Sequence, residues 1–130
     1  MKLLVLGTLF LTATPFVHAA ATAFDGTGLL THCEAAIRLA DRQQPNDGDA
    51  QSGAYCLGFV NGIMEMATDT AVTLVNSDHR TSLPCAPAEG LTTGQAVRVV
   101  LKYLNLHPET LHKSAQLLVV VALREAFPCK

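Results

Sequence analysis

The chain lacks several features that identify common classes of protein. It contains no tryptophan, no cluster of basic residues and no Cys-x-x-Cys pair. Charged residues make up only 15% of the sequence, and the formal net charge is -2 at pH 7. A mildly acidic chain has no electrostatic reason to bind nucleic acid or an anionic membrane surface. The missing Cys-x-x-Cys pair also argues against a zinc ribbon and against thioredoxin-like chemistry.

Sequence motifs of catalysis are missing as well. The chain has neither a glycine-rich phosphate loop nor a nucleophile-elbow motif. Glu65 and Asp69 lie one helical turn apart and could suggest paired catalytic carboxylates, but a solvated or interface helix face is the favoured explanation. We therefore expect that the protein is not an enzyme, and we expect no catalytic residues and no cofactor.

One short stretch, His-Pro-Glu-Thr-Leu-His from His107 to His112, could be a metal site. Proline favours the first turn of a helix, which would place His107 at the helix cap and Glu109 in the first turn. Two histidines five positions apart in a helix point roughly 140° away from each other at ~100° per residue. Glu109 and His112 are three apart and could pair. We interpret the stretch as a helix junction and expect no bound metal.

The first residues have the pattern of a secretory signal peptide. Met1 and Lys2 form a short positive start, an apolar run follows, and small residues suited to signal peptidase come next. We expect residues 1–19 to be the signal, with cleavage after Ala19 or, alternatively, after Ala21, and residues 20–130 to form one domain. A retained anchor is the alternative, but the apolar run is shorter than the ~20 residues that a spanning helix needs. The pattern therefore predicts an exported protein without membrane association after cleavage.

The spacing of apolar residues predicts an all-α fold. Helix periodicity and helix-breaking loops delimit about four helices. The loops are expected at Gln43 to Gly53 and at Asn76 to Gly90. The expected helices run from Phe24 to Arg42, from Ala54 to about Val75, from a cap at Thr92 or Thr93 to Asn105 or Leu106, and from Pro108 to about Phe127.

Two details of these helices carry further expectations. Gly58 and Gly62 lie one turn apart, and each weakens a helix by ~1 kcal/mol relative to alanine, so they are expected to let another backbone approach closely. The last helix has a second apolar face formed by Leu117, Val120 and Val121. A small bundle does not readily cover two apolar faces of one helix, which predicts a homodimer.

The chain has four cysteines, and an even number in a small exported chain predicts disulfides. Cys33 and Cys56 lie at similar distances from the first loop, and Cys85 and Cys129 lie at equal distances from the turn at His107. This spacing predicts the pairs Cys33–Cys56 and Cys85–Cys129. The fold would then be a small bundle of two antiparallel hairpins, each closed by a disulfide.

The segments Cys56 to Met66 and Cys85 to Cys129 resemble the Rap/Tai family, whose members are immunity proteins against peptidoglycan amidases of the type VI secretion system. The resemblance lies in an ordered set of short motifs, which here are Cys56/Gly58/Phe59/Gly62, Cys85/Pro87, Gly94/Gln95, Lys102/Tyr103/Leu104, His107/Pro108/Glu109 and Phe127/Pro128/Cys129. We interpret these motifs as mainly structural.

The resemblance implies a periplasmic, helical and often dimeric protein that binds an amidase effector and blocks its active-site cleft. The polar stretch Asn76 to Leu83 lies outside the shared motifs, and Asn76, Ser77, Asp78, His79 and Arg80 are its candidate contact residues. The acidic loop at Asp47 and Asp49 is the alternative contact. A periplasmic binding protein of the same fold with a different protein partner is the alternative function.

Overall fold

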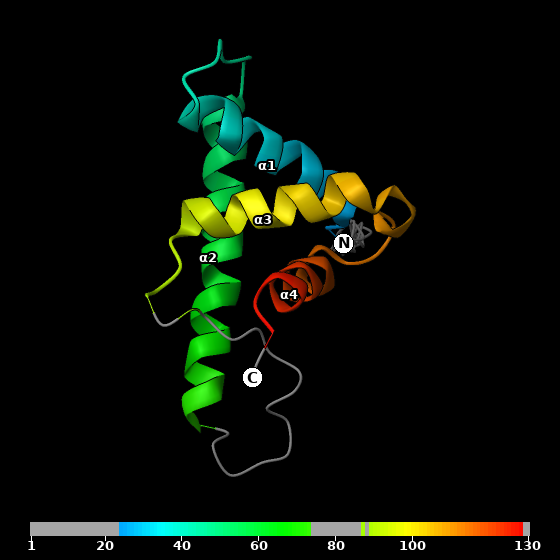
Figure 1. The fold of residues 1–130 in the computed structure, drawn as a ribbon. Helices are drawn as coiled ribbons and strands as arrows, with labels where there is room; N and C mark the ends of the chain where they lie inside the picture. Colours follow the sequence, from blue (N-terminus) through cyan, green and yellow to red (C-terminus); the bar gives the residue numbers. More distant parts are fainter. Residues whose placement is uncertain (1–23, 74–86, 88, 129–130) are drawn as a thin grey trace, which may run out of the picture.

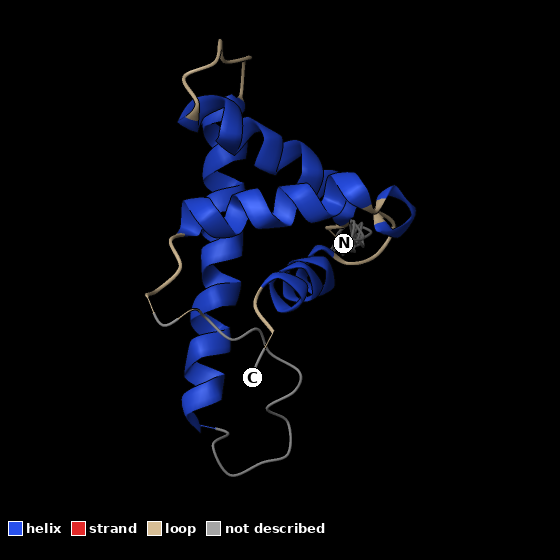
Figure 2. Cartoon of the chain, viewed as in Figure 1, coloured by secondary structure: helices blue, strands red, loops and turns tan. Residues whose placement is uncertain are grey.

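The computed structural model describes residues 24–73, 87 and 89–128, and this part of the chain is helical (Figures 1 and 2). It contains no strand, only an isolated antiparallel bridge between Asp25 and Ser114. The four-helix, all-α prediction is confirmed. The helices are α1 (Gly26–Ala40), α2 (Asp49–Thr73), α3 (Thr93–Leu106) and α4 (Ala115–Ala126), and a short 3₁₀ helix, η2 (Pro108–Thr110), precedes α4.

Helices α1 and α2 form an antiparallel hairpin that is closed by a disulfide. Cys33 and Cys56 are bonded, with 5.1 Å between their Cα atoms, and both are completely buried. The two helices approach closely at Gly53, since a Cβ atom there would be 3.0 Å from the Cα atom of Ala36. The predicted Cys33–Cys56 pair is confirmed, whereas Cys85 and Cys129 lie outside the described residues.

Helix α2 begins earlier than its sequence suggested. Residues Asp49 to Gly53 were expected in a loop, but they form the first turn of the helix. The Asp49 carboxylate accepts hydrogen bonds from Arg38 at 3.0 and 2.8 Å and from the backbone N–H of Asn46 at 2.8 Å. These contacts with α1 and with the preceding loop outweigh the low helix propensity of a segment that contains serine and glycine.

Helix α3 begins as predicted. Thr92 is its N-cap and forms a capping box with Gln95, in which each side chain satisfies a backbone N–H of the other residue. Thr93, the other candidate cap, instead donates its hydroxyl to the Asn61 side chain at 2.8 Å. The two neighbouring threonines therefore have different functions: one starts α3 and the other attaches it to α2.

The predicted helix from Pro108 to Phe127 is wrong in its first third. Only η2 forms there, and α4 starts at Ala115. The chain between them pairs with the start of α1, since Gly26 donates to the Lys113 carbonyl and Ala115 donates to the Phe24 carbonyl, each at 3.0 Å. These backbone hydrogen bonds to a distant segment replace the local bonds that a continuous helix would make.

Aromatic contacts hold this N-terminal segment in place. The ring of Phe24 packs edge-on against Tyr55 and Phe59 of α2, with ring centroids 5.0 and 5.1 Å apart, and His32 of α1 lies against Phe24 and Tyr55. The pairing between residues 24–26 and 113–115 then positions the start of α4.

The core is built from all four helices. Helix α2 is the longest, and α1 packs against it. Helix α3 crosses α2 and contacts α1, with α4 below α3 (Figure 1). The core residues are Leu29, Cys33, Ala36, Cys56, Val60, Ile63, Ala96, Val97, Val100, Leu104, Ala115, Leu118, Val119, Ala122 and Leu123.

The structure does not support the expectation for Gly58 and Gly62. A Cβ atom at either position would have no neighbouring heavy atom within 4 Å, so neither glycine lets another part of the described chain approach. Within the described part of the chain, no helix has the length and apolarity needed to span a membrane. The expected signal peptide lies outside the described residues.

Candidate functional site

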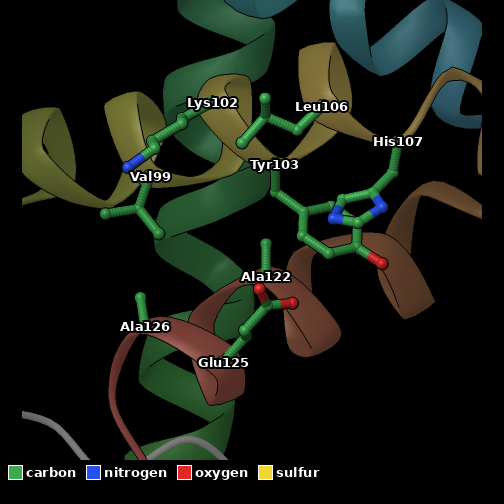
Figure 3. Close-up of a pocket in the computed structure, with 8 residues that line it drawn as sticks. All are labelled: Val99, Lys102, Tyr103, Leu106, His107, Ala122, Glu125 and Ala126. Carbon is green, nitrogen blue, oxygen red and sulfur yellow. The ribbon is translucent and has the colours of Figure 1, made fainter.

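A groove of about 250 Å³ lies between α3 and α4 (Figure 3). Small-molecule sites are commonly ~300–1,000 Å³, so this groove has room for a protein side chain rather than for a large substrate. The lining residues come from α3, its C-cap and α4, and they are Val99, Lys102, Tyr103, Leu106, His107, Ala122, Glu125 and Ala126.

The groove has apolar surface between two opposite charges. Val99 and Ala126 lie on facing helices at one end, while Tyr103 projects towards Ala122 (Figure 3). Lys102 on α3 and Glu125 on α4 are both exposed. This combination is suited to binding a partner's apolar side chain with flanking polar groups.

His107 closes one end of the groove. Its ring packs against Tyr103 with centroids 4.4 Å apart, and its Nδ1 atom lies 3.2 Å from Glu109 Oε1. The backbone N–H of Glu109 and then the His107 side chain lower the pKa of the Glu109 carboxyl below its usual range. Glu109 therefore pairs with His107, whereas the sequence spacing had allowed a pair with His112.

His107 and Glu109 lie at a helix junction, as the motif suggested, although η2 and not α4 begins there. His112 is an exposed residue between η2 and α4. Among the described residues there is no group of three or more histidine, cysteine or acidic side chains placed to hold a metal ion.

A second groove, of about 460 Å³, lies between α1, α2 and the start of α3. Its exposed apolar side chains include Leu39 and Leu57, which are 38% and 40% exposed. Arg98 is the charged residue in its lining, and Arg98 already forms an ion pair with Asp41 that lowers the pKa of that carboxyl. The second groove therefore lacks the convergent polar groups that orient a ligand.

The structure describes one of the two candidate contact regions of the sequence. Asn76, Ser77, Asp78, His79 and Arg80 lie outside the described residues. In the acidic loop, Asp47 is exposed, but only 4% of Asp49 is exposed. The ion pair with Arg38 and the Asn46 N–H lower the Asp49 pKa to about 2. Asp49 is therefore engaged within the hairpin and is wrong as a partner contact.

Sequence reasoning missed the groove between α3 and α4. Three of its lining residues, Lys102, Tyr103 and His107, belong to motifs that were interpreted as structural. In the Lys102/Tyr103/Leu104 motif, that interpretation holds for the buried Leu104 but not for the exposed Lys102. The available signal for the groove in the sequence was a charged residue next to apolar positions on each helix, namely Lys102 and Glu125. Their position across one groove depends on how α3 packs on α4.

A comparison with family models supplies the remaining evidence. The model described as Rap1a immunity proteins matches residues 25–129, which include all four helices. Comparisons with curated proteins and with solved structures gave no match.

Proposed function

The chain belongs to the Rap1a immunity protein family, and from this we propose that it protects its owner by inhibiting a type VI secretion peptidoglycan amidase. The observation that carries the proposal is the family match over residues 25–129. The motif resemblance to the Rap/Tai family supplies the class of effector. Such an inhibitor acts by binding its effector. It catalyses no reaction and needs neither a metal nor a cofactor.

The proposed mechanism is a steric block of the amidase active-site cleft. A cleft that admits a peptidoglycan peptide is open, and a firm projection can fill it. The connection between α2 and α3 supplies the candidate contact residues Asn76 to Arg80. Asp78, His79 and Arg80 carry hydrogen-bonding groups, and a disulfide at Cys85 would attach the downstream end of the loop to the bundle. Such attachment lowers the entropy cost of ordering the loop on binding.

The proposed location is the periplasm. The Cys33–Cys56 disulfide supports this location, because structural disulfides form and persist in oxidising compartments. The amidase substrate, peptidoglycan, is in the same compartment, so the protein would meet its effector there.

We also propose a homodimer. On α4, Leu117 is 48% exposed, and Val120 and Val121 are only partly buried. This face of α4 leaves apolar surface that a second copy would cover. Light scattering of the mature protein is expected to give the mass of two chains, and a monomer at micromolar concentration would contradict the proposal.

A co-expression experiment tests the immunity function. The cognate amidase, which a neighbouring gene is expected to encode, is directed to the periplasm alone, with the intact protein, or with a variant in which Asp78, His79 and Arg80 are changed to alanine. We expect lysis with the amidase alone, survival with the intact protein and lysis with the triple variant. Lys113→Ala, at an exposed position outside both candidate contact regions, is the matched control and should protect fully.

Each result tests a different part of the proposal. Lysis in the presence of the intact, expressed protein rejects immunity towards that amidase and favours a binding protein with another partner. Full protection by the triple variant retains immunity but rejects the loop from Asn76 to Arg80 as the projection that blocks the cleft.

A further inference from the structure

We propose that the groove between α3 and α4 is a second contact site for the effector. It would receive one apolar side chain of the effector, flanked by an acidic group that faces Lys102 and a basic group that faces Glu125. The inference rests on the proposed immunity function and adds a site of stated chemistry on the described part of the molecule.

The size and lining of the groove favour a protein side chain as its occupant. The volume of about 250 Å³ is several times the ~30 Å³ that one water molecule occupies in the liquid. Val99 and Ala126 provide apolar surface on the two facing helices, Ala122 is a buried residue of the lining, and the Tyr103 ring lies beside His107 (Figure 3). Buried tyrosine contacts are frequent centres of binding energy in protein interfaces.

The charges of the groove indicate which charged groups the partner carries at this contact. Within the described part of the chain, Lys102 and Glu125 form no ion pair with each other or with any third residue, in contrast to Arg38–Asp49 and Arg98–Asp41. Both charges are therefore available for pairing across an interface without breaking an internal contact. Opposite charges at the rim of an apolar contact set the register of a partner and exclude wrong partners.

The position of the groove separates it from the proposed dimer contact. Ala122 and Glu125 point from α4 towards α3 (Figure 3), whereas Leu117 lies on the part of α4 that is exposed opposite the core. A second copy bound through Leu117 would leave the groove accessible. The effector is therefore the occupant that the geometry favours.

Calorimetric titration of the purified effector into the full mature protein tests the inference. We expect Lys102→Glu and Glu125→Lys each to raise Kd at least tenfold, and Ala126→Trp, which fills the groove from an exposed position, to raise it further. Lys113→Glu and Glu34→Lys reverse exposed charges outside the groove and should leave Kd unchanged. Leu106→Asp provides a further exposed substitution in the groove if the tryptophan variant does not fold, and thermal melting checks the fold of every variant.

The possible results are distinct. Folded groove variants that bind as tightly as the wild type, while the wild type inhibits the effector, overturn the groove and leave the immunity function intact. Failure of the wild type itself to bind rejects the immunity function and this contact together. If Ala126→Trp converts a dimer into a monomer in light scattering and leaves effector binding unchanged, the occupant is a second copy and the proposal is wrong.

Discussion

Single residues determine how closely the segments of this small protein approach one another. Gly26 is buried at the start of α1, where the chain from η2 to α4 passes directly over it. A Cβ atom at this position would lie 2.9 Å from both the Cα atom and the carbonyl oxygen of Leu111. These are backbone atoms, which cannot rotate away as the end of a side chain can. The close approach therefore requires glycine.

Alanine at Gly26 is expected to destabilise the protein by about 1–3 kcal/mol, the usual cost of overpacking. Gly58→Ala is the matched control, because position 58 is helical with open space around it, and alanine there should stabilise the helix by about 0.5–1 kcal/mol. Urea unfolding measures both. A fully stable Gly26→Ala variant would contradict the packing, and a destabilised Gly58→Ala variant would show that another backbone does approach α2.

The Arg38–Asp49 pair predicts a specific dependence of stability on pH. The hydrogen bonds from Arg38 and then from the Asn46 backbone lower the Asp49 pKa from 3.8 to about 2. Because the folded-state pKa is below the unfolded one, the contribution of the pair is fully present above about pH 4 and is lost as the pH falls through about 2. Asp49→Asn should therefore lower the melting temperature by several degrees at pH 7.

The difference between the wild type and Asp49→Asn should shrink as the pH is lowered from 4 towards 2. Thermal melts at pH 7, 4 and 3 measure it, and Asp47→Asn, at an exposed position in the loop that precedes α2, should show no such trend. A difference that stays constant with pH would assign the effect to packing and not to the charge of Asp49.

At the scale of the helices, apolar periodicity predicted where helices form. It did not predict the helix boundaries that depend on non-local contacts. The spacing of the apolar residues predicted α3, whose start was expected at Thr92 or Thr93 and lies after Thr92. Of the residues in that pattern, Ala96, Val97, Val100 and Leu104 are buried and Leu101 is partly buried. The early start of α2 and the late start of α4 were missed. Each depends on a contact with α1 or its N-terminal segment, through Arg38 in one case and residues 24–26 in the other, and no local pattern contains that information.

The groove could not be predicted for the same reason. Lys102 and Glu125 are visible in the sequence as charged residues on two helices, but their position across one groove follows from the packing of α3 on α4. The candidate loop from Asn76 to Arg80 lies outside the described residues and remains a prediction from the sequence.

The two predicted disulfides, one in each hairpin, can be tested together. Peptide mapping without reduction should find Cys33–Cys56, which the structure contains, and Cys85–Cys129, which remains a prediction. Replacing Cys33 and Cys56 by alanine should cost about 3–4 kcal/mol of stability in the chain-entropy model for a loop of this length. A linkage between Cys56 and Cys85 would contradict the arrangement of two separately closed hairpins.

At the scale of the whole molecule, the described residues form a scaffold of four helices packed against one another. Its core is apolar across all four helices, and Asp49, the buried charged residue among the described positions, is paired. Two of its grooves differ in one respect that bears on function. Among the described residues, Lys102 and Glu125 at the α3–α4 groove form no ion pair, whereas Arg98 at the other groove is paired with Asp41. A scaffold of this kind is suited to holding contact residues in a fixed arrangement for a protein partner.

The most direct test of the account is a titration of the purified cognate amidase with this protein, with release of cleaved peptidoglycan as the readout. The account predicts that activity falls in proportion to the added protein and is abolished at a fixed molar ratio, because inhibition results from tight binding at the cleft. Full amidase activity in the presence of a large excess of folded, oxidised protein would contradict it.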